Sequence, residues 1–145
     1  MPKTVGVTLG ALLVAVPSLA GCSSSDAPES TPFTVAYTAD DGTNVTVEIA
    51  PVDPHCSVFG DAWSYLGIEG DAGVGGLIPI DATSPSSAVT AQLGDGLTFL
   101  SQERPAANED GFVATDLAGR VAMLEDDGSY ATVSEDASIS GTFTC

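Results

Sequence analysis

The sequence predicts an all-β domain, a single antiparallel β-sandwich or small barrel with one disulfide. Short segments alternate apolar and polar residues with the period of two that half-buried strands require. Asp-Gly, Gly-rich and Pro-containing turns separate these segments about every 8–12 residues, which is typical of sandwiches and barrels. No stretch of 12 residues has the apolar spacing of an amphipathic helix.

We expect residues 1–21 to be a lipoprotein signal peptide. Lys3 precedes the uncharged run VGVTLGALLVAVPSLA, whose 16 residues are short for a bilayer span; a span needs roughly 20. No basic cluster follows the run, as expected of a signal peptide rather than a transmembrane helix. An ordinary secretory signal with a chance cysteine is the alternative.

The run ends in Leu19-Ala20-Gly21-Cys22, which resembles the bacterial lipobox. In that class the cysteine thiol takes a diacylglycerol and a peptidase cuts before it. We therefore expect Cys22 to be the lipid attachment site and the first mature residue. Two or three acyl chains on one residue give stable anchoring to the cell membrane.

Residues 22–32 are expected to be the lipidated cysteine and a flexible tether. The segment SSSDAPESTP holds serine, proline and acid and no large apolar group, so it cannot bury a core of its own. The extracytoplasmic β-rich domain is then residues 33–145.

The domain is predicted to start with a β-hairpin. FTVAYT alternates Phe33, Val35 and Tyr37 against polar or small residues, and NVTVEI repeats the pattern after the turn ADDGT. A Pro-bounded corner, PVDP, leads to the strand HCSVF.

The apolar, Gly-rich middle is also predicted to form strands. Trp63, Tyr65 and Gly67 alternate with Ser64, Leu66 and Ile68, which favours a strand over a helix. The segment GDAGVGG is interpreted as a flexible hairpin or a site of close strand packing. Pro79 predicts a sheet edge, because proline cannot donate to a ladder. Further expected strands are SAVTAQL, LTFL, FVATD, RVAMLE, SYATVS and ASISGTFTC, the last placing Cys145 on its apolar face.

The cysteine count indicates one disulfide. With Cys22 lipidated, Cys56 and Cys145 remain, and an exported domain with two cysteines is expected to pair them. A disulfide between them would close a loop of about 90 residues. In the chain-entropy model this stabilises a fold by roughly 4–5 kcal/mol. Two free thiols are the alternative, and a metal site with His55 is a weaker one.

The charge balance excludes some partners. The chain has 20 acidic residues against three Lys and Arg, a formal net charge of −17. Such a chain has no electrostatic attraction to nucleic acid or to an anionic lipid surface.

The sequence carries no convincing catalytic set, and we expect no enzymatic activity, no catalytic residue and no cofactor. His55 is the single histidine and no G-x-S-x-G accompanies it. Carboxylate pairs abound, but most lie in or beside Gly turns, where Asp is expected for turn chemistry. They are Asp40/Asp41, Glu109/Asp110, Glu125/Asp126/Asp127 and Glu135/Asp136.

No EF-hand is present, and no metal ligand is assigned. With Gly128 or Gly111 at the loop's sixth position, the first and twelfth positions are not acidic. A looser surface calcium site between two acidic loops remains an alternative to solvated hairpin tips.

The middle strands carry apolar residues on both faces. These side chains fit a packed core, or alternatively a pocket for an acyl chain. They are Leu66, Ile68, Leu77, Ile78, Ile80, Leu97, Phe99 and Leu100.

The lipobox, the polar tether, DGTNVTV, a Cys some ten residues later, the Gly-rich apolar middle, GSYAT and the terminal TFTC together resemble the mycobacterial 19 kDa lipoprotein antigen family. The resemblance covers about Asp41 to Cys145 and implies an actinobacterial cell-envelope lipoprotein, exposed outside the cell and antigenic in pathogens. It implies no catalytic residue. The tether here is shorter and less rich in threonine, and the chain is more acidic.

The sequence thus predicts a lipid-anchored, extracytoplasmic lipoprotein with a non-enzymatic surface interaction or antigen-type role. Expected partners are the membrane, through the N-terminal lipid, and an envelope or host protein. The alternative function is a carrier domain for a lipid or another small apolar ligand.

Overall fold

The computed structural model describes residues 30–81, 83 and 88–145, which form an antiparallel all-β fold. The strands are β1 (Thr31–Thr38), β2 (Asn44–Ile49), β3 (His55–Phe59), β4 (Ala62–Glu69), β5 (Ala72–Pro79), β6 (Ala88–Gly94), β7 (Leu97–Ser101), β8 (Ala106–Asn108), β9 (Gly111–Leu124) and β10 (Tyr130–Thr144). The expected fold class is confirmed, including the disulfide between Cys56 and Cys145.

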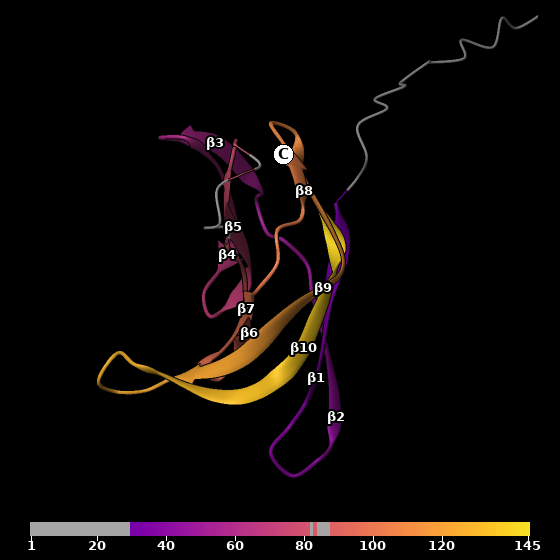
Figure 1. Cartoon of the computed structure of the whole chain (residues 1–145), viewed down its shortest axis with the longest axis vertical. Helices are drawn as coiled ribbons and strands as arrows, with labels where there is room; N and C mark the ends of the chain where they lie inside the picture. The colour runs from indigo at the N-terminus through magenta and orange to yellow at the C-terminus, as the bar shows by residue number, and fades with distance from the viewer. Residues whose placement is uncertain (1–29, 82, 84–87) are drawn as a thin grey trace, which may run out of the picture.

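All strands belong to one sheet with the order β2-β1-β10-β9-β7-β6-β5-β4-β3, and β8 pairs with β9 beside this path. The sheet curls into a half-barrel, as Figure 1 shows, so that β1 and β2 stand opposite the middle strands. β2 lies across the interior from β5 and β6. The inner face of the curl therefore forms the core, and the outer face meets solvent.

The core is built on aromatic rings from four strands. Phe33, Tyr65, Phe112 and Phe143 are buried and lie 5.1–5.8 Å apart between the centroids of contacting rings. Offset and edge-on contacts of this kind add to the free energy of burying the rings. This aromatic cluster fills the end of the half-barrel that the disulfide closes.

Glycines allow the rings to lie close to the sheet. A Cβ added to Gly141 would come within 2.6 Å of the Phe33 ring, and one on Gly67 within 3.1 Å of the Phe143 ring. The absence of a side chain at these positions lets the sheet curl tightly around its aromatic filling. Gly73 likewise confirms close strand packing in GDAGVGG, because its added Cβ would lie 2.5 Å from the Gly67 carbonyl oxygen.

The expected first hairpin, β3 and the alternation in β4 are confirmed, but four details differ. β1 starts at Thr31, which pairs with Thr142, two residues before the expected boundary. FVATD and RVAMLE form one strand, β9, and SYATVS and ASISGTFTC form one strand, β10. The three-residue β8 was not expected.

The edge position predicted for Pro79 is wrong. β5 lies between β4 and β6 inside the sheet. Its pairing with β6 ends at Leu77↔Ala88, whereas its pairing with β4 continues to Ala62↔Pro79. Proline is tolerated there because it is the last residue of the strand, beyond the point where β6 pairs.

Three irregular sites in their ladder let β9 and β10 remain continuous. In β9, Thr115 and Asp116 together face Ser140, and Asp116 adopts a φ of 45°. The extra residue shifts the inward phase from Phe112 and Ala114 to Leu117. In β10, the other two sites lie at Val133 and at Glu135 and Asp136.

Candidate functional site

The outer face of β3–β5 exposes apolar side chains. Phe59 is 72 % exposed, Leu66 52 % and Leu77 45 %. Strand alternation places these residues opposite the inward-facing Cys56, Tyr65 and Ile78. We call this surface the β3–β5 outer face. Its other exposed or half-buried members are His55, Ser57, Ala62, Ser64 and Ile68, and the buried Gly73, Gly75 and Pro79 lie on the same side of β5.

The β3–β5 outer face carries no carboxylate, although the chain is strongly acidic. Among the described residues, every acid except Glu48 lies in a turn or loop, at a strand end or in a bulge. Polar members of the face are serines and one histidine. The result is a neutral, partly apolar surface bordered by acidic turns, which is the composition expected of a contact surface rather than a solvated one.

Two acidic hairpin tips share one local structure. The β1–β2 turn has the sequence ADDGT and the β9–β10 turn EDDGS, and each closes with the Gly in a left-handed conformation, φ 84° at Gly42 and 82° at Gly128. The amide of Thr43 donates to the Asp41 carboxylate over 2.9 Å, and that of Ser129 to Asp127 over 2.8 Å.

These hydrogen bonds hold the pKa of both carboxyls below its ordinary value. For Asp41 the Thr43 side chain and then its amide are the main causes, and for Asp127 those of Ser129. The carboxylates of Asp41 and Asp127 therefore already accept hydrogen bonds from donors in their own turns. Within residues 30–81, 83 and 88–145, no group of three or more His, Cys, Asp or Glu is placed to hold a metal ion.

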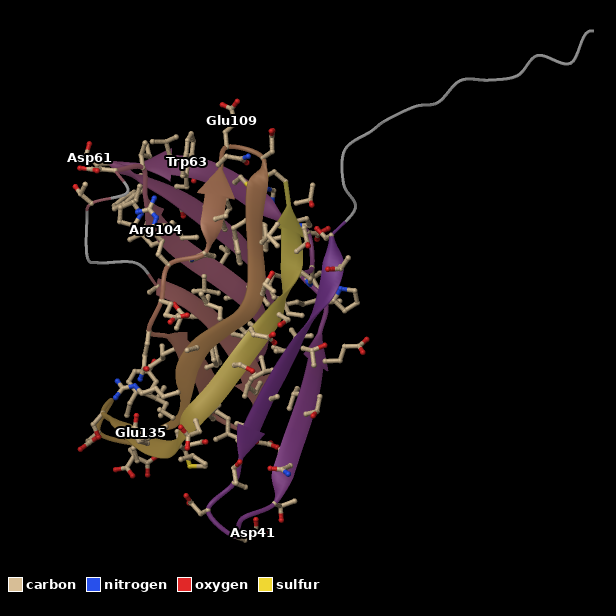
Figure 2. All side chains as sticks on the ribbon, turned by 45° about the vertical axis from the view of Figure 1, so that its right-hand side comes forward. Asp41, Asp61, Trp63, Arg104, Glu109 and Glu135 are labelled. Carbon is tan, nitrogen blue, oxygen red and sulfur yellow. A yellow bond between two sulfur atoms is a disulfide. The ribbon has the colours of Figure 1, made fainter. Side chains whose placement is uncertain are left out.

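The acidic clusters lie at both ends of the molecule. Figure 2 shows Asp41 and Glu135 toward one end and Asp61 and Glu109 toward the other. The carboxylate clusters singled out in the sequence are thus distributed over separate turns and a bulge. Asp40 and Asp41 lie in the first hairpin tip, Glu109 and Asp110 in the β8–β9 turn, Glu125 to Asp127 in the β9–β10 turn, and Glu135 and Asp136 in the β10 bulge.

His55 lies exposed at the start of β3, opposite Leu66. A surface depression of about 280 Å³ beside it is lined by Asp53, Glu69 and apolar neighbours. The described structure records no hydrogen bond from its imidazole to a serine or a carboxylate. His55 is therefore an exposed strand residue on the β3–β5 outer face.

The apolar residues considered for a ligand pocket do not lie together. Ile78 and Phe99 are fully buried in the core, whereas Leu66, Leu77 and Ile80 are about half exposed. The remaining three of the set, Ile68, Leu97 and Leu100, are half-buried. The two-faced pattern in the middle strands thus reflects a core on one side and an exposed apolar surface on the other.

Sequence reasoning missed Arg104, which joins two parts of the fold. Its guanidinium donates to the carbonyl oxygens of Pro79 and Asp81, and the bond to Asp81 measures 2.9 Å. Arg104 thereby holds the segment after β7 against the end of β5. Figure 2 shows it near Trp63 at the end of the molecule that carries Asp61. No sequence pattern announces this contact, because the acceptors are backbone oxygens.

Tyr65 ties the same region to β8. Its hydroxyl donates to the carbonyl oxygen of Asn108 over 2.5 Å. Burial raises the pKa of Tyr65 to about 12, although the positive charge of Arg104 lowers it slightly. The hydroxyl therefore stays protonated at physiological pH and is available as a donor.

The predicted disulfide is confirmed, with the Cα atoms of Cys56 and Cys145 5.5 Å apart. It joins β3, at one end of the sheet order, to the residue that follows β10. Leu19, Ala20, Gly21 and Cys22 lie outside the described residues. In the part of the chain that the structure describes, no helix has the length and apolar character needed to cross a bilayer.

No protein-family model, curated protein or solved structure matches this chain. The resemblance to the 19 kDa lipoprotein antigens accordingly remains a prediction from the sequence.

Proposed function

We propose that this chain is a lipid-anchored cell-envelope lipoprotein of the 19 kDa antigen type, which acts through surface contacts and not through catalysis. The thiol of Cys22 takes the lipid, and a peptidase cuts between Gly21 and Cys22. The observation that carries the contact role is the β3–β5 outer face, an exposed, neutral and partly apolar surface on a domain whose charges lie elsewhere.

The start of the domain supports display close to a membrane. The Ser30 hydroxyl donates to the Thr144 carbonyl oxygen over 3.2 Å and accepts from the Thr144 amide over 3.0 Å. Eight residue steps separate Cys22 from Ser30, a reach of at most about 28 Å. A domain fixed at this point would remain within that distance of the lipid.

A partner that binds the β3–β5 outer face can bury its apolar area without removing a carboxylate of this face from water. Fully burying a Leu or Phe side chain stabilises a complex by about 1.5–3 kcal/mol. Phe59, Leu66 and Leu77 are already partly covered, so the two leucines have roughly half of that to contribute and Phe59 somewhat more. An envelope or host protein with a neutral, apolar contact surface is the partner this composition favours.

Anchoring is tested on the chain made in an actinobacterial host. We expect the protein in the membrane fraction, with a mass that corresponds to cleavage before Cys22 plus the lipid. Cys22→Ala should prevent lipidation, so the lipid mass is absent from the variant. A wild-type chain without lipid would contradict the anchoring proposal.

The contact role is tested by placing a photoreactive amino acid at Leu77 of the anchored chain. The matched control is Val113, which is 49 % exposed on β9. We expect a discrete crosslinked partner from Leu77 that is absent from Val113. Equal labelling from both positions, or none, would remove the support for the β3–β5 outer face.

The carrier alternative receives less support, because the residues considered for a pocket are split between the core and the surface. Native mass spectrometry of the protein from its host separates the two. We expect the mass of the lipidated chain alone; an additional mass lost on denaturation would favour a carrier. Specific turnover of a substrate would overturn the non-enzymatic proposal.

A further inference from the structure

Among the described residues, β2 forms an edge of the sheet. It pairs with β1 and stands at the end of the strand order. In Figures 1 and 2, which differ by a 45° rotation, β2 borders the outside of the molecule. Its six residues pair with β1 in continuous register from Asn44 to Ile49. The outer side of β2 is thus a regular edge that no other described strand pairs with.

The turn fixes which backbone groups of β2 point outward. Ala39 and Thr43 close the hairpin, since the Ala39 amide donates to the Thr43 carbonyl oxygen over 2.8 Å. Hydrogen-bonded and non-hydrogen-bonded pairs alternate from there along an antiparallel ladder. Asn44, Thr46 and Glu48 are therefore in non-hydrogen-bonded pairs, and their amides and carbonyls face away from β1.

β2 lacks the usual protection of an edge strand. Proline, lysine and bulges commonly prevent edge-to-edge pairing, and residues 44–49 contain none of these. The opposite edge, β3, is shorter and is held at Cys56 by the disulfide. Of the two strands at the ends of the sheet order, β2 is therefore the longer and the less protected.

We propose that β2 pairs antiparallel with β2 of a second copy of this chain, centred on Thr46. The segment NVTVE is nearly symmetric about this residue. In the proposed register Thr46 faces Thr46, Asn44 faces Glu48, and the half-buried Val45 faces Val47. No carboxylate faces another carboxylate, and Asn44 supplies an amide donor to Glu48.

Self-pairing is favoured over an unrelated strand by this symmetry. Each outward amide and carbonyl meets its counterpart, and each side chain meets a compatible one. The net charge of −17 on each copy opposes association, and salt screens that repulsion. We therefore expect the paired fraction to increase with ionic strength.

The register is tested with single cysteines in the full-length chain, extracted from its host in mild detergent. A hydrogen-bonded antiparallel pair places its Cα atoms about 5.5 Å apart. Thr46→Cys should therefore give a covalent dimer with a short bifunctional thiol reagent. Glu48→Cys is the matched control, since the two copies of residue 48 would lie four residues apart, roughly 13 Å along the strands.

A second pair of variants tests the edge without added thiols. Thr46→Lys places two like charges face to face. It should reduce the protein content of each detergent-solubilised particle from two chains to one. Thr132→Lys adds the same charge to an exposed position on β10, which pairs with β9 and not with β2, and should leave the dimer intact. A monomeric wild-type chain, crosslinking from both cysteines, or a dimer that survives Thr46→Lys would overturn the proposal.

Discussion

Glycine at position 119 determines how closely β7 approaches β9. A Cβ there would overlap the ring of Phe99, which is fully buried, and would lie 2.5 Å from the Leu100 carbonyl oxygen. Neither group is free to move, because one is in the core and the other belongs to the backbone of a paired strand. The position therefore tolerates no side chain without a shift of the sheet.

We predict that Gly119→Ala lowers the free energy of unfolding by about 1–3 kcal/mol, the usual cost of overpacking a core. Gly75→Ala is the matched control, because its Cβ would meet atoms at 3.4 Å or more. Urea unfolding measures both, and the control should change by less than about 1 kcal/mol. Equal losses would show that the Phe99 contact is not the cause.

At the hairpin tips, the lowered pKa values of Asp41 and Asp127 predict an effect of pH. A carboxyl with a lowered pKa in the folded state stabilises the fold above its unfolded pKa, about 3.9. That contribution is lost as the pH falls through the lower folded value. We predict that Ser129→Ala raises the titration midpoint of Asp127, measured by carboxyl NMR, because Ser129 supplies its main hydrogen bonds.

Asp41 is the internal control in that experiment, since its donors come from Thr43. Its midpoint should not move in Ser129→Ala. A shift of both carboxyls would indicate a general electrostatic change, and no shift of Asp127 would contradict the assigned cause.

At the scale of the strand, the bulge at Asp116 keeps β9 continuous. The Ser140 hydroxyl accepts from the Asp116 amide over 2.8 Å and donates to its carboxylate over 3.1 Å. Asp116 holds a φ of 45°, where most side chains are strained and Asp or Asn are tolerated better. The cross-strand contact and the backbone conformation thus depend on the same pair of residues.

We predict that Asp116→Ala destabilises the fold more than Asp116→Gly. Both variants lose the carboxylate, but alanine also pays roughly 1–2 kcal/mol for the left-handed conformation. Thermal unfolding of the two variants measures the difference directly. Equal stabilities of the two variants would mean that residue 116 leaves the left-handed conformation when Asp116 is replaced.

The sequence could predict most strands, but not that the two halves of β9 join into one strand and the two halves of β10 into another. Alternation identified both halves of β9 and of β10, and the turn residues identified the hairpins. The alternation breaks at Asp116 and at Glu135, and a break of phase in sequence is indistinguishable from a turn. The similarity of DDGTNVTV and DDGSYATV, which reflects the shared hairpin turn, was a usable signal that the sequence analysis missed.

At the scale of the molecule, the sequence could not predict which apolar residues are covered. Leu66 and Ile78 both stand among other apolar residues in the Gly-rich middle of the sequence. Leu66 nevertheless lies on the outer face, and Ile78 lies in the core. The difference arises because β1 and β2 cover only the inner face of the curled sheet. The β3–β5 outer face is thus a property of the topology, and alternation alone reveals only that both faces are apolar.

The disulfide holds the half-barrel closed at its aromatic end. Cys145 follows Phe143, and Cys56 faces the same side of the sheet as Tyr65, so the bond spans the aromatic cluster. The Cys145 amide also donates to the Asp110 carbonyl oxygen over 3.0 Å. Two independent links therefore fix the end of the chain, and one of them fixes β3.

We predict that replacing Cys56 and Cys145 together by Ser lowers the free energy of unfolding by roughly 4–5 kcal/mol, from the loop-closure entropy of 89 intervening steps. Amide hydrogen exchange should then show a loss of protection in β9, which is paired on both sides and whose amides exchange when the whole fold opens. The edge strand β3, which has one paired neighbour and loses its covalent link, should lose protection as well. Cys22→Ser is the matched control, because that cysteine is outside the disulfide. Unchanged protection in β9 would contradict the loop-closure origin of the stabilisation, and unchanged protection in β3 would mean that its pairing with β4 is enough to hold it in place.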